Sequence, residues 1–142
     1  MFKNLQGNKG AVSIRFNLMG SSICLVNCHL TPHDNNLQKR INDYYSIIDS
    51  QTFQSEKISS ILDHDLVFWF GDLNFRLDAK SLSSEEIVKL LHGNDTKRLL
   101  QEDELKQVMF QNSAFSGFKE CEISFKPTYK FVPESSQIYD EK

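Results

Sequence analysis

The residues best suited to chemistry lie between Asp65 and Arg76, where an apolar run leads into a glycine and then into polar residues. Asp72 directly follows Gly71, and Asn74 and Arg76 come at every second position after it. Alternate side chains of an extended backbone point the same way, so an acid, an amide and a base would converge. A carboxylate can accept a proton from water, and an amide can donate to a developing negative oxygen. This pattern suits hydrolysis at phosphorus, although a polar turn after a strand uses the same residue types.

Two histidines are further candidates. His29 ends an apolar stretch that is expected to be a strand, and a histidine there can protonate a leaving oxygen or hold a phosphate. A strand-end histidine with ordinary hydrogen bonds is the alternative. His33 follows Pro32 at an expected helix start, where positive charge is unfavourable unless an anion is present. We interpret His33 as a loop residue and a candidate substrate contact.

Two other segments have the residue types to bind phosphate groups. Asn8 and Lys9 lie in a turn between two glycines, and such a turn can surround a phosphate with backbone amides and one ammonium group. An ordinary hairpin turn is the alternative. Tyr129 and Lys130 follow Pro127 and combine a hydroxyl donor with a cation, which suits a polyanionic ring substrate. Surface pairs of this kind are also frequent without any function.

The composition is that of one soluble globular domain. The chain has 142 residues, of which 39% are hydrophobic and 25% charged. A net charge of -3, without a long Lys/Arg block, argues against binding nucleic acid through an overall positive field. No apolar run approaches the length of a membrane span, and the first residues lack the apolar core of a signal peptide.

The cysteines and the short motifs exclude other classes of site. Cys24 and Cys28 would lie roughly 13 Å apart on a strand, too far to form a disulfide. We therefore expect Cys24, Cys28 and Cys121 to be reduced, buried thiols of a cytosolic protein. No His/Cys cluster has metal-ligand spacing, and neither a Gly-rich nucleotide motif nor a serine nucleophile elbow is present.

Hydrophobic alternation predicts a sheet. Expected strands cover residues 11–18 and 23–30, with a turn at residues 20–22 between them. The apolar run before Gly71 predicts a strand buried on both faces in the middle of the sheet, with Phe68, Trp69 and Phe70 in the core. Gly71 then removes a side chain where another group must come close.

Helices are expected to cover this sheet. The first should begin at Asp34 as N-cap and end near Asp49. Its apolar stripe would consist of Leu37, Ile41, Tyr44, Tyr45 and Ile48. A second helix should begin with a capping box of Ser83 and Glu86 and end at Gly93. A third is expected from residue 95 to 112, and residues 125–131 should be extended. This alternation of strands and helices defines an α/β chain.

Four blocks, taken in order, resemble the inositol polyphosphate 5-phosphatases. The blocks are Gly7 to Val12, Asn27 to Leu30 with His33, Trp69 to Arg76, and Phe125 to Lys130. The resemblance covers nearly the whole chain and is weakest between residues 79 and 122.

The resemblance implies the endonuclease/exonuclease/phosphatase fold, a two-sheet α/β sandwich, and magnesium-dependent removal of the 5-phosphate from inositol phosphates and phosphoinositides. It further implies that Asp72 activates or orients the attacking water, that Asn74 contacts the scissile phosphate and that His29 binds it. The substrate phosphates would be held by Asn8, Lys9, His33, Arg76, Tyr129 and Lys130, with the last three of these residues near the 4-position.

The chain also departs from the family pattern. The family's metal-binding glutamate lies upstream of Gly7, and its Trp-x-Asp-Arg and Asp-His blocks lie beyond Lys142. We therefore expect residues 1–142 to be the central fragment of one catalytic domain, with no metal ligand of its own. Without the metal ligand and the catalytic histidine, the fragment alone should be inactive or nearly so.

Two alternatives remain open at this point. One is a nuclease or another phosphodiesterase of the same fold, and the other is a non-catalytic interaction module derived from it. The expected partners are a phosphoinositide or inositol polyphosphate and, through it, the membrane surface, with no nucleic acid. The expected location is cytoplasmic, with transient membrane contact. The preferred phosphoinositide, the membrane compartment and the partner domains do not follow from these residues.

Overall fold

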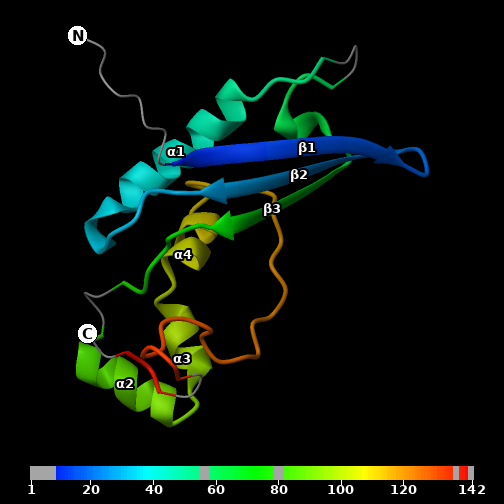
Figure 1. Cartoon of the computed structure of the whole chain (residues 1–142). Helices are drawn as coiled ribbons and strands as arrows, with labels where there is room; N and C mark the ends of the chain where they lie inside the picture. Colours follow the sequence, from blue (N-terminus) through cyan, green and yellow to red (C-terminus); the bar gives the residue numbers. More distant parts are fainter. Residues whose placement is uncertain (1–8, 55–57, 79–81, 136–137, 141–142) are drawn as a thin grey trace. The chain divides into compact units, whose positions relative to one another are not determined.

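The computed structural model describes residues 9–54, 58–78, 82–135 and 138–140. The chain divides into two compact units, residues 1–75 and residues 76–142, and each is described here by itself. The first unit holds a sheet and one long helix, and the second holds three short helices and a C-terminal segment without regular structure (Figure 1).

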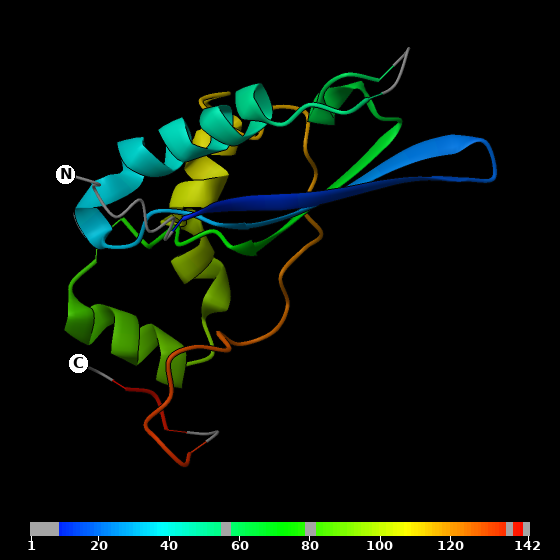
Figure 2. The ribbon, with the colours of Figure 1, turned by 45° about the horizontal axis from the view of Figure 1, so that its top comes forward.

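A three-stranded sheet of order β1-β2-β3 forms the centre of the first unit. Its strands are β1 (Gly10–Leu18), β2 (Ser21–His29) and β3 (Leu66–Asp72). β1 and β2 form an antiparallel hairpin, which extends past the start of β3 in Figure 2. β2 and β3 are parallel, with His29 opposite Asp72. The turn of the hairpin lies at Met19 and Gly20, both at positive φ, one residue earlier than the sequence indicated.

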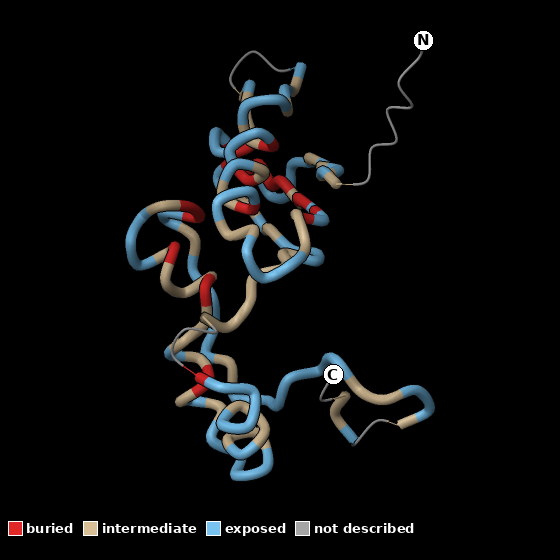
Figure 3. The backbone as a smooth tube through the Cα atoms, turned by 90° about the vertical axis from the view of Figure 1, so that its left-hand side faces the viewer, coloured by how far each residue is buried: buried red, intermediate tan, exposed pale blue. Residues whose placement is uncertain are grey.

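The helix α1 (Leu37–Ser50) covers one face of this sheet (Figure 1). Tyr44 packs on Trp69 of β3, with ring centroids 5.1 Å apart, and the Gln51 amide donates to the carbonyl of Ala11 at 3.1 Å. Buried residues of the first unit gather where the helix faces the strands (Figure 3). They include Cys24, Val26, Cys28, Leu30, Arg40, Tyr44, Ile47 and Ile61.

Two expectations for this helix are wrong. Asp34 does not cap it, because residues 34–36 form the short 3-10 helix η1 (Asp34–Asn36) and α1 begins only afterwards. The buried stripe is Arg40, Tyr44 and Ile47, while Tyr45 is exposed. The face that α1 buries is therefore not the expected apolar stripe, because this face includes the buried Arg40. A second 3-10 helix, η2 (Ile61–Asp63), leads into β3.

The opposite face of the sheet is apolar and exposed. Its exposed residues are Val12, Ile14, Phe16, Leu18, Leu66, Phe68 and Phe70. The expectation of a central β3 buried on both faces is therefore wrong for the described strands: β2 is central, and only the Trp69 side of β3 is covered. Phe68 and Phe70 are 53% and 47% exposed, because alternate residues of a strand point to opposite faces.

The second unit contains α2 (Ser84–His92), α3 (Thr96–Gln101) and α4 (Glu104–Phe110). The Ser83–Glu86 capping box of α2 is confirmed, as is its end at Gly93. The single helix expected at residues 95–112 is wrong, because Asp103 caps a separate helix by accepting from the Lys106 N–H at 2.8 Å. The segment 125–131 has no strand, and its only pairing among the described residues is the isolated bridge between Phe131 and Tyr139.

Candidate active site

His29 and Asp72 meet at the carboxyl ends of the two parallel strands. The strand register places the two residues opposite each other, and the distance from His29 Nε2 to Asp72 Oδ2 is 3.5 Å. Their side chains are 50% and 63% exposed, so both are accessible to solvent and to a ligand. A histidine and a carboxylate therefore lie next to each other at the strand ends of the first unit.

Gly71 makes this close pairing of the two strand ends possible. Its φ of 120° is a conformation that side chains rarely adopt, and a Cβ atom there would lie 2.0 Å from the carbonyl oxygen of Cys28. It would also lie 2.7 Å from Asn27 Oδ1 and 2.8 Å from the Cys28 nitrogen. The prediction that another group approaches this glycine closely is confirmed, and that group is the backbone of β2.

Asn74 lies just beyond the end of β3, where the chain leaves the extended conformation. Its φ is 54°, so the strict alternation expected from Asp72 to Arg76 stops here. The Asn74 backbone N–H donates to Asp72 Oδ1 at 3.2 Å, and its side-chain Nδ2 donates to the Leu30 carbonyl at 3.0 Å.

His33 is exposed and has a backbone φ of 75°. Its carbonyl accepts a hydrogen bond from Arg40 Nη1 at 2.8 Å, and the same nitrogen donates to the Thr31 carbonyl at 3.3 Å. Asp43 accepts from the Thr31 N–H at 2.8 Å. Arg40 and Asp43 were missed at the sequence level, where Arg40 had no apparent role. Their spacing of three residues on the predicted helix was the available signal.

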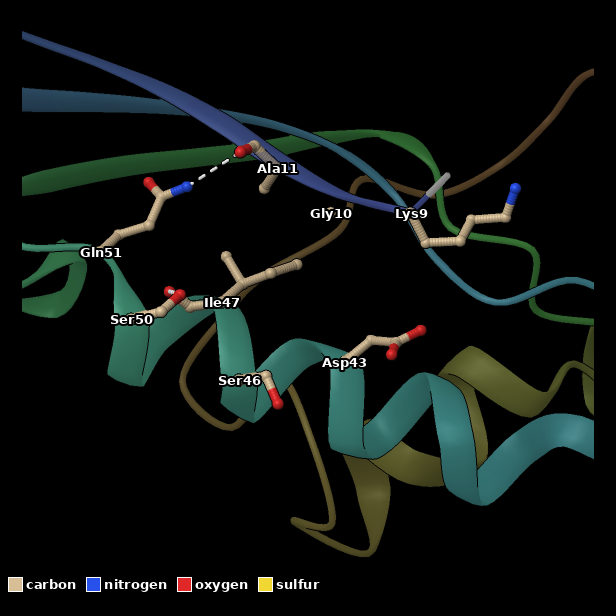
Figure 4. Close-up of a pocket in the computed structure, with 8 residues that line it drawn as sticks. All are labelled: Lys9, Gly10, Ala11, Asp43, Ser46, Ile47, Ser50 and Gln51. Atoms are coloured by element: carbon tan, nitrogen blue, oxygen red, sulfur yellow. Dashed lines mark hydrogen bonds between the residues drawn. The ribbon is translucent and has the colours of Figure 1, made fainter. Parts of the chain in front are cut away.

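Lys9 borders a hollow of about 320 Å³ between the start of β1 and the helix α1. Figure 4 shows Lys9 and Asp43 at one end of this hollow and Gln51 at the other. The Gly10 that follows Lys9 is paired with His29, so Lys9 is only two strands away from Asp72. Asn8 lies outside the described residues.

Arg76, Tyr129 and Lys130 belong to the second unit. The backbone N–H of Arg76 donates to Glu104 Oε2 at 3.0 Å, which fixes the start of this unit on α4. Tyr129 is 78% exposed. Lys130 pairs with Asp140, and the hydrogen bond that its ammonium group donates to this carboxylate raises the pKa of Lys130. Their convergence with the His29–Asp72 pair stays a prediction.

The described residues do not form a metal site of their own. No group of three or more His, Cys, Asp or Glu side chains within the described ranges is arranged to hold a metal ion. His29 and Asp72 supply two donors, whereas Mg²⁺ prefers near-octahedral oxygen coordination. The donor set therefore does not fit a complete magnesium site, and we derive no step through a metal.

The geometry suits acid–base chemistry on an exposed phosphate. Asp72 directs Oδ1 to the Asn74 N–H and Oδ2 towards His29. A carboxylate held in this way can orient a water molecule and accept its proton, and an adjacent histidine can donate to a phosphate oxygen.

No helix among the described residues is both long and apolar enough to cross a bilayer.

Comparison with known proteins identifies the fold. The family model described as endonuclease/exonuclease/phosphatase family 2 matches residues 2–142. A solved inositol polyphosphate 5-phosphatase domain of spSynaptojanin, in complex with inositol (1,4)-bisphosphate and a calcium ion, superposes with a TM-score of 0.85 at 38% sequence identity. The superposition covers 97% of this chain and 39% of the solved chain, so the α/β fold of this family is confirmed in part of its extent.

Two curated relatives are similar over most of the chain. Human phosphatidylinositol 4,5-bisphosphate 5-phosphatase A is 40% identical over 126 residues, which are 88% of this chain and 12% of the relative. Mouse inositol polyphosphate 5-phosphatase K is 37% identical over 136 residues, which are 94% of this chain and 28% of the relative. The chain thus spans a minor part of the length of the proteins it matches.

Proposed function

The chain belongs to the inositol polyphosphate 5-phosphatase family of the endonuclease/exonuclease/phosphatase fold, and on that basis we propose that its complete domain removes the 5-phosphate of phosphoinositides or inositol polyphosphates. The reaction is attack of water on phosphorus. The observation that carries the proposal is the exposed His29–Asp72 pair, with 3.5 Å between the imidazole and the carboxylate, at adjacent ends of two parallel strands.

The residues at and near the strand ends have distinct roles in the proposed reaction. Asp72 orients the attacking water and accepts its proton, while His29 binds the scissile phosphate. Asn74 contacts the same phosphate, and its bond from Nδ2 to the Leu30 carbonyl holds the side chain in place. Asn8, Lys9 and His33 contact substrate from the first unit.

The remaining substrate contacts come from the second unit. Arg76, Tyr129 and Lys130 bind phosphate near the 4-position of the ring. Lys130 is paired with Asp140, so a substrate phosphate would share or replace this carboxylate. Two cations and a phenol suit a substrate with several phosphate groups.

We also propose that residues 1–142 are the central part of a single catalytic domain. The proposed cofactor is Mg²⁺, with ligands beyond the pair formed by His29 and Asp72. The solved spSynaptojanin domain, which is in complex with a calcium ion, supports binding of a divalent cation. The 142-residue chain alone is then inactive or nearly so.

Within the family, residues 61–70 resemble the skeletal-muscle and kidney-enriched inositol phosphatase, and we propose that type for the chain. The mouse 5-phosphatase K is among the similar relatives, with an identity of 37% against 40% for the human 5-phosphatase A. The proposed location is cytoplasmic, with transient membrane contact through a phosphoinositide headgroup.

The test begins with extension of the reading frame on both sides and expression of the complete domain. With Mg²⁺ it should release phosphate from vesicles containing phosphatidylinositol 4,5-bisphosphate or from a dissolved inositol polyphosphate, and it should not nick DNA. Asp72→Asn should lower kcat by about a hundredfold or more, because it removes the proton acceptor. Circular dichroism should show the variant to be folded, since the Asp72 side chain is exposed.

Other outcomes would overturn the proposal. Near-normal phosphate release by Asp72→Asn would refute the role of this carboxylate. DNA nicking without phosphate release would favour a nuclease. A full-length sequence without the upstream glutamate and the downstream Asp-His block, together with no activity, would indicate a non-catalytic module.

A further inference from the structure

We propose that Arg40 and Asp43 of α1 are positioning residues for the reaction. They do not lie at the strand ends that carry His29 and Asp72, and they act through the loop Leu30–His33 that follows β2. The inference rests on the proposed function, because it takes the His29–Asp72 pair as the place of hydrolysis.

Arg40 is a charged residue in the core, with a relative exposure of 0%. Burial of a guanidinium group is costly unless the group is hydrogen-bonded, so its partners decide its effect. Its Nη1 donates to the carbonyl of His33 at 2.8 Å and to that of Thr31 at 3.3 Å. One nitrogen therefore holds two carbonyls of the same loop, which is possible only when the loop turns back towards the helix.

Asp43 lies three residues further along α1, on the same face as Arg40. Its Oδ2 accepts from the Thr31 N–H at 2.8 Å. Both backbone polar groups of Thr31 are thus bound by side chains of α1, the N–H by Asp43 and the carbonyl by Arg40. A residue held at both backbone groups has little freedom to move.

The preceding residue is held from the opposite direction. The Leu30 N–H donates to the Asp72 carbonyl at 3.0 Å, and the Leu30 carbonyl accepts from Asn74 Nδ2 at 3.0 Å. Leu30 is thus bound to β3 and the segment after it, while Thr31 is bound to α1. The chain just after His29 is fixed between the helix and the end of β3, and this arrangement sets the separation of His29 from Asp72.

Two further contacts extend this arrangement. The Arg40 guanidinium carbon lies 5.5 Å from the centroid of the Phe75 ring, so the same side chain also contacts the segment that follows Asn74. His33 has φ 75° and ψ 150°, an unusual conformation for a residue other than glycine, and the bond from Arg40 supports it. Arg40 therefore contacts both segments that carry proposed site residues.

The experiment uses the complete domain and four variants. Asp43→Ala removes the acceptor for Thr31, whereas Asp43→Asn keeps an amide oxygen in its place. Arg40→Lys keeps the charge but replaces the planar guanidinium by one ammonium group. Asp49→Ala is the matched control, because Asp49 is an exposed acid on the same helix.

We expect Asp43→Ala and Arg40→Lys to lower kcat by about tenfold, because small displacements of reacting groups have large effects on rate. KM should change by less than about threefold, since neither residue contacts substrate. Asp43→Asn and Asp49→Ala should retain kcat within about twofold of the parent. Hydrogen exchange of the Thr31 amide should be faster in Asp43→Ala than in Asp43→Asn.

All rates are normalised to the folded fraction measured by circular dichroism, so that loss of folding does not count as loss of catalysis. An active parent with unchanged kcat in Asp43→Ala and Arg40→Lys would overturn the inference. Failure of Asp43→Asn to restore kcat would also overturn it. An inactive parent domain would instead overturn the proposed function, which separates the two failures.

Discussion

Replacement of Gly71 by alanine, which adds one methyl group, should strongly lower the stability of the first unit. The added Cβ would lie 2.0 Å from the Cys28 carbonyl oxygen and 2.8 Å from the Cys28 nitrogen. Both atoms belong to the backbone of β2, which is held by pairing with β1 and β3. Neither atom can move away without breaking the ladder between the two parallel strands.

The expected cost has two parts. Forcing extra atoms into a packed place costs about 1–3 kcal/mol, and a non-glycine residue in a disfavoured backbone conformation costs about 1–3 kcal/mol more. The sum of about 2–6 kcal/mol is a large part of the roughly 5–15 kcal/mol that stabilises a typical domain. The ends of β2 and β3 should also separate, so kcat should fall in the folded fraction.

The assay is urea unfolding of the complete domain, followed by circular dichroism, together with phosphate release. Gly20→Ala is the matched control, because Gly20 has a φ of 89° and open space around its Cβ position. It should lose only the backbone term, about 1–2 kcal/mol. An equal loss of stability in both variants would refute the argument from close approach.

A second background separates backbone from side-chain contacts. The Cβ would also lie 2.7 Å from Asn27 Oδ1, an atom that a substitution can remove. If the backbone of Cys28 is the main obstacle, adding Asn27→Ala to Gly71→Ala should restore little stability. Full recovery in the double variant would show that the side chain, and not the strand pairing, requires glycine at this position.

Three further predictions concern stability and reactivity. The Asp65 carboxylate accepts hydrogen bonds from the Ser22 N–H and hydroxyl, and these bonds lower its pKa. The charged carboxylate therefore stabilises the fold above the ordinary pKa of 3.8, and this stabilisation is lost as the pH falls below that value. In urea unfolding from about pH 5 to about pH 3, Asp65→Asn should lose less stability than the parent. Burial raises the pKa of the Cys24 and Cys28 thiols, whereas Cys121 is exposed. Peptide mapping after mild thiol labelling should therefore find Cys121 modified first. Equal labelling of all three cysteines would contradict this prediction. Asp103→Ala should cost about 1 kcal/mol of unfolding free energy by removing the cap of α4, while Asp103→Ser should retain most of the stability; similar losses in both would argue against capping.

The local sequence predicted most elements and the polar side chains at the strand ends. Period-two alternation predicted β1 and β2, and the Ser83–Glu86 spacing predicted the start of α2. Gly71 indicated a close approach of another group at the end of this strand, which the structure confirms. These features depend on neighbouring residues, so they can be read from short stretches.

Other features do not follow from the apolar pattern of a short stretch. Residues 95–112 contain two helices because Asp103 bonds to the Lys106 N–H, and a helical pattern alone does not exclude one long helix. Cys121 is exposed, so the expectation that all three cysteines are buried thiols is wrong for this residue. The apolar run of β3 was taken as doubly covered, but only the face towards Tyr44 is covered within the first unit.

The sequence by itself determined that an acid, an amide and a histidine follow apolar strands in an α/β chain, because composition and periodicity depend only on the order of residues. Only the tertiary structure decided that His29 lies opposite Asp72. The register of the two strands is set by pairing between segments that are 43 residues apart in the sequence. The tertiary structure also decided that a buried Arg40 binds the loop after His29, because the partners of a charged side chain come from the fold and not from its neighbours in sequence.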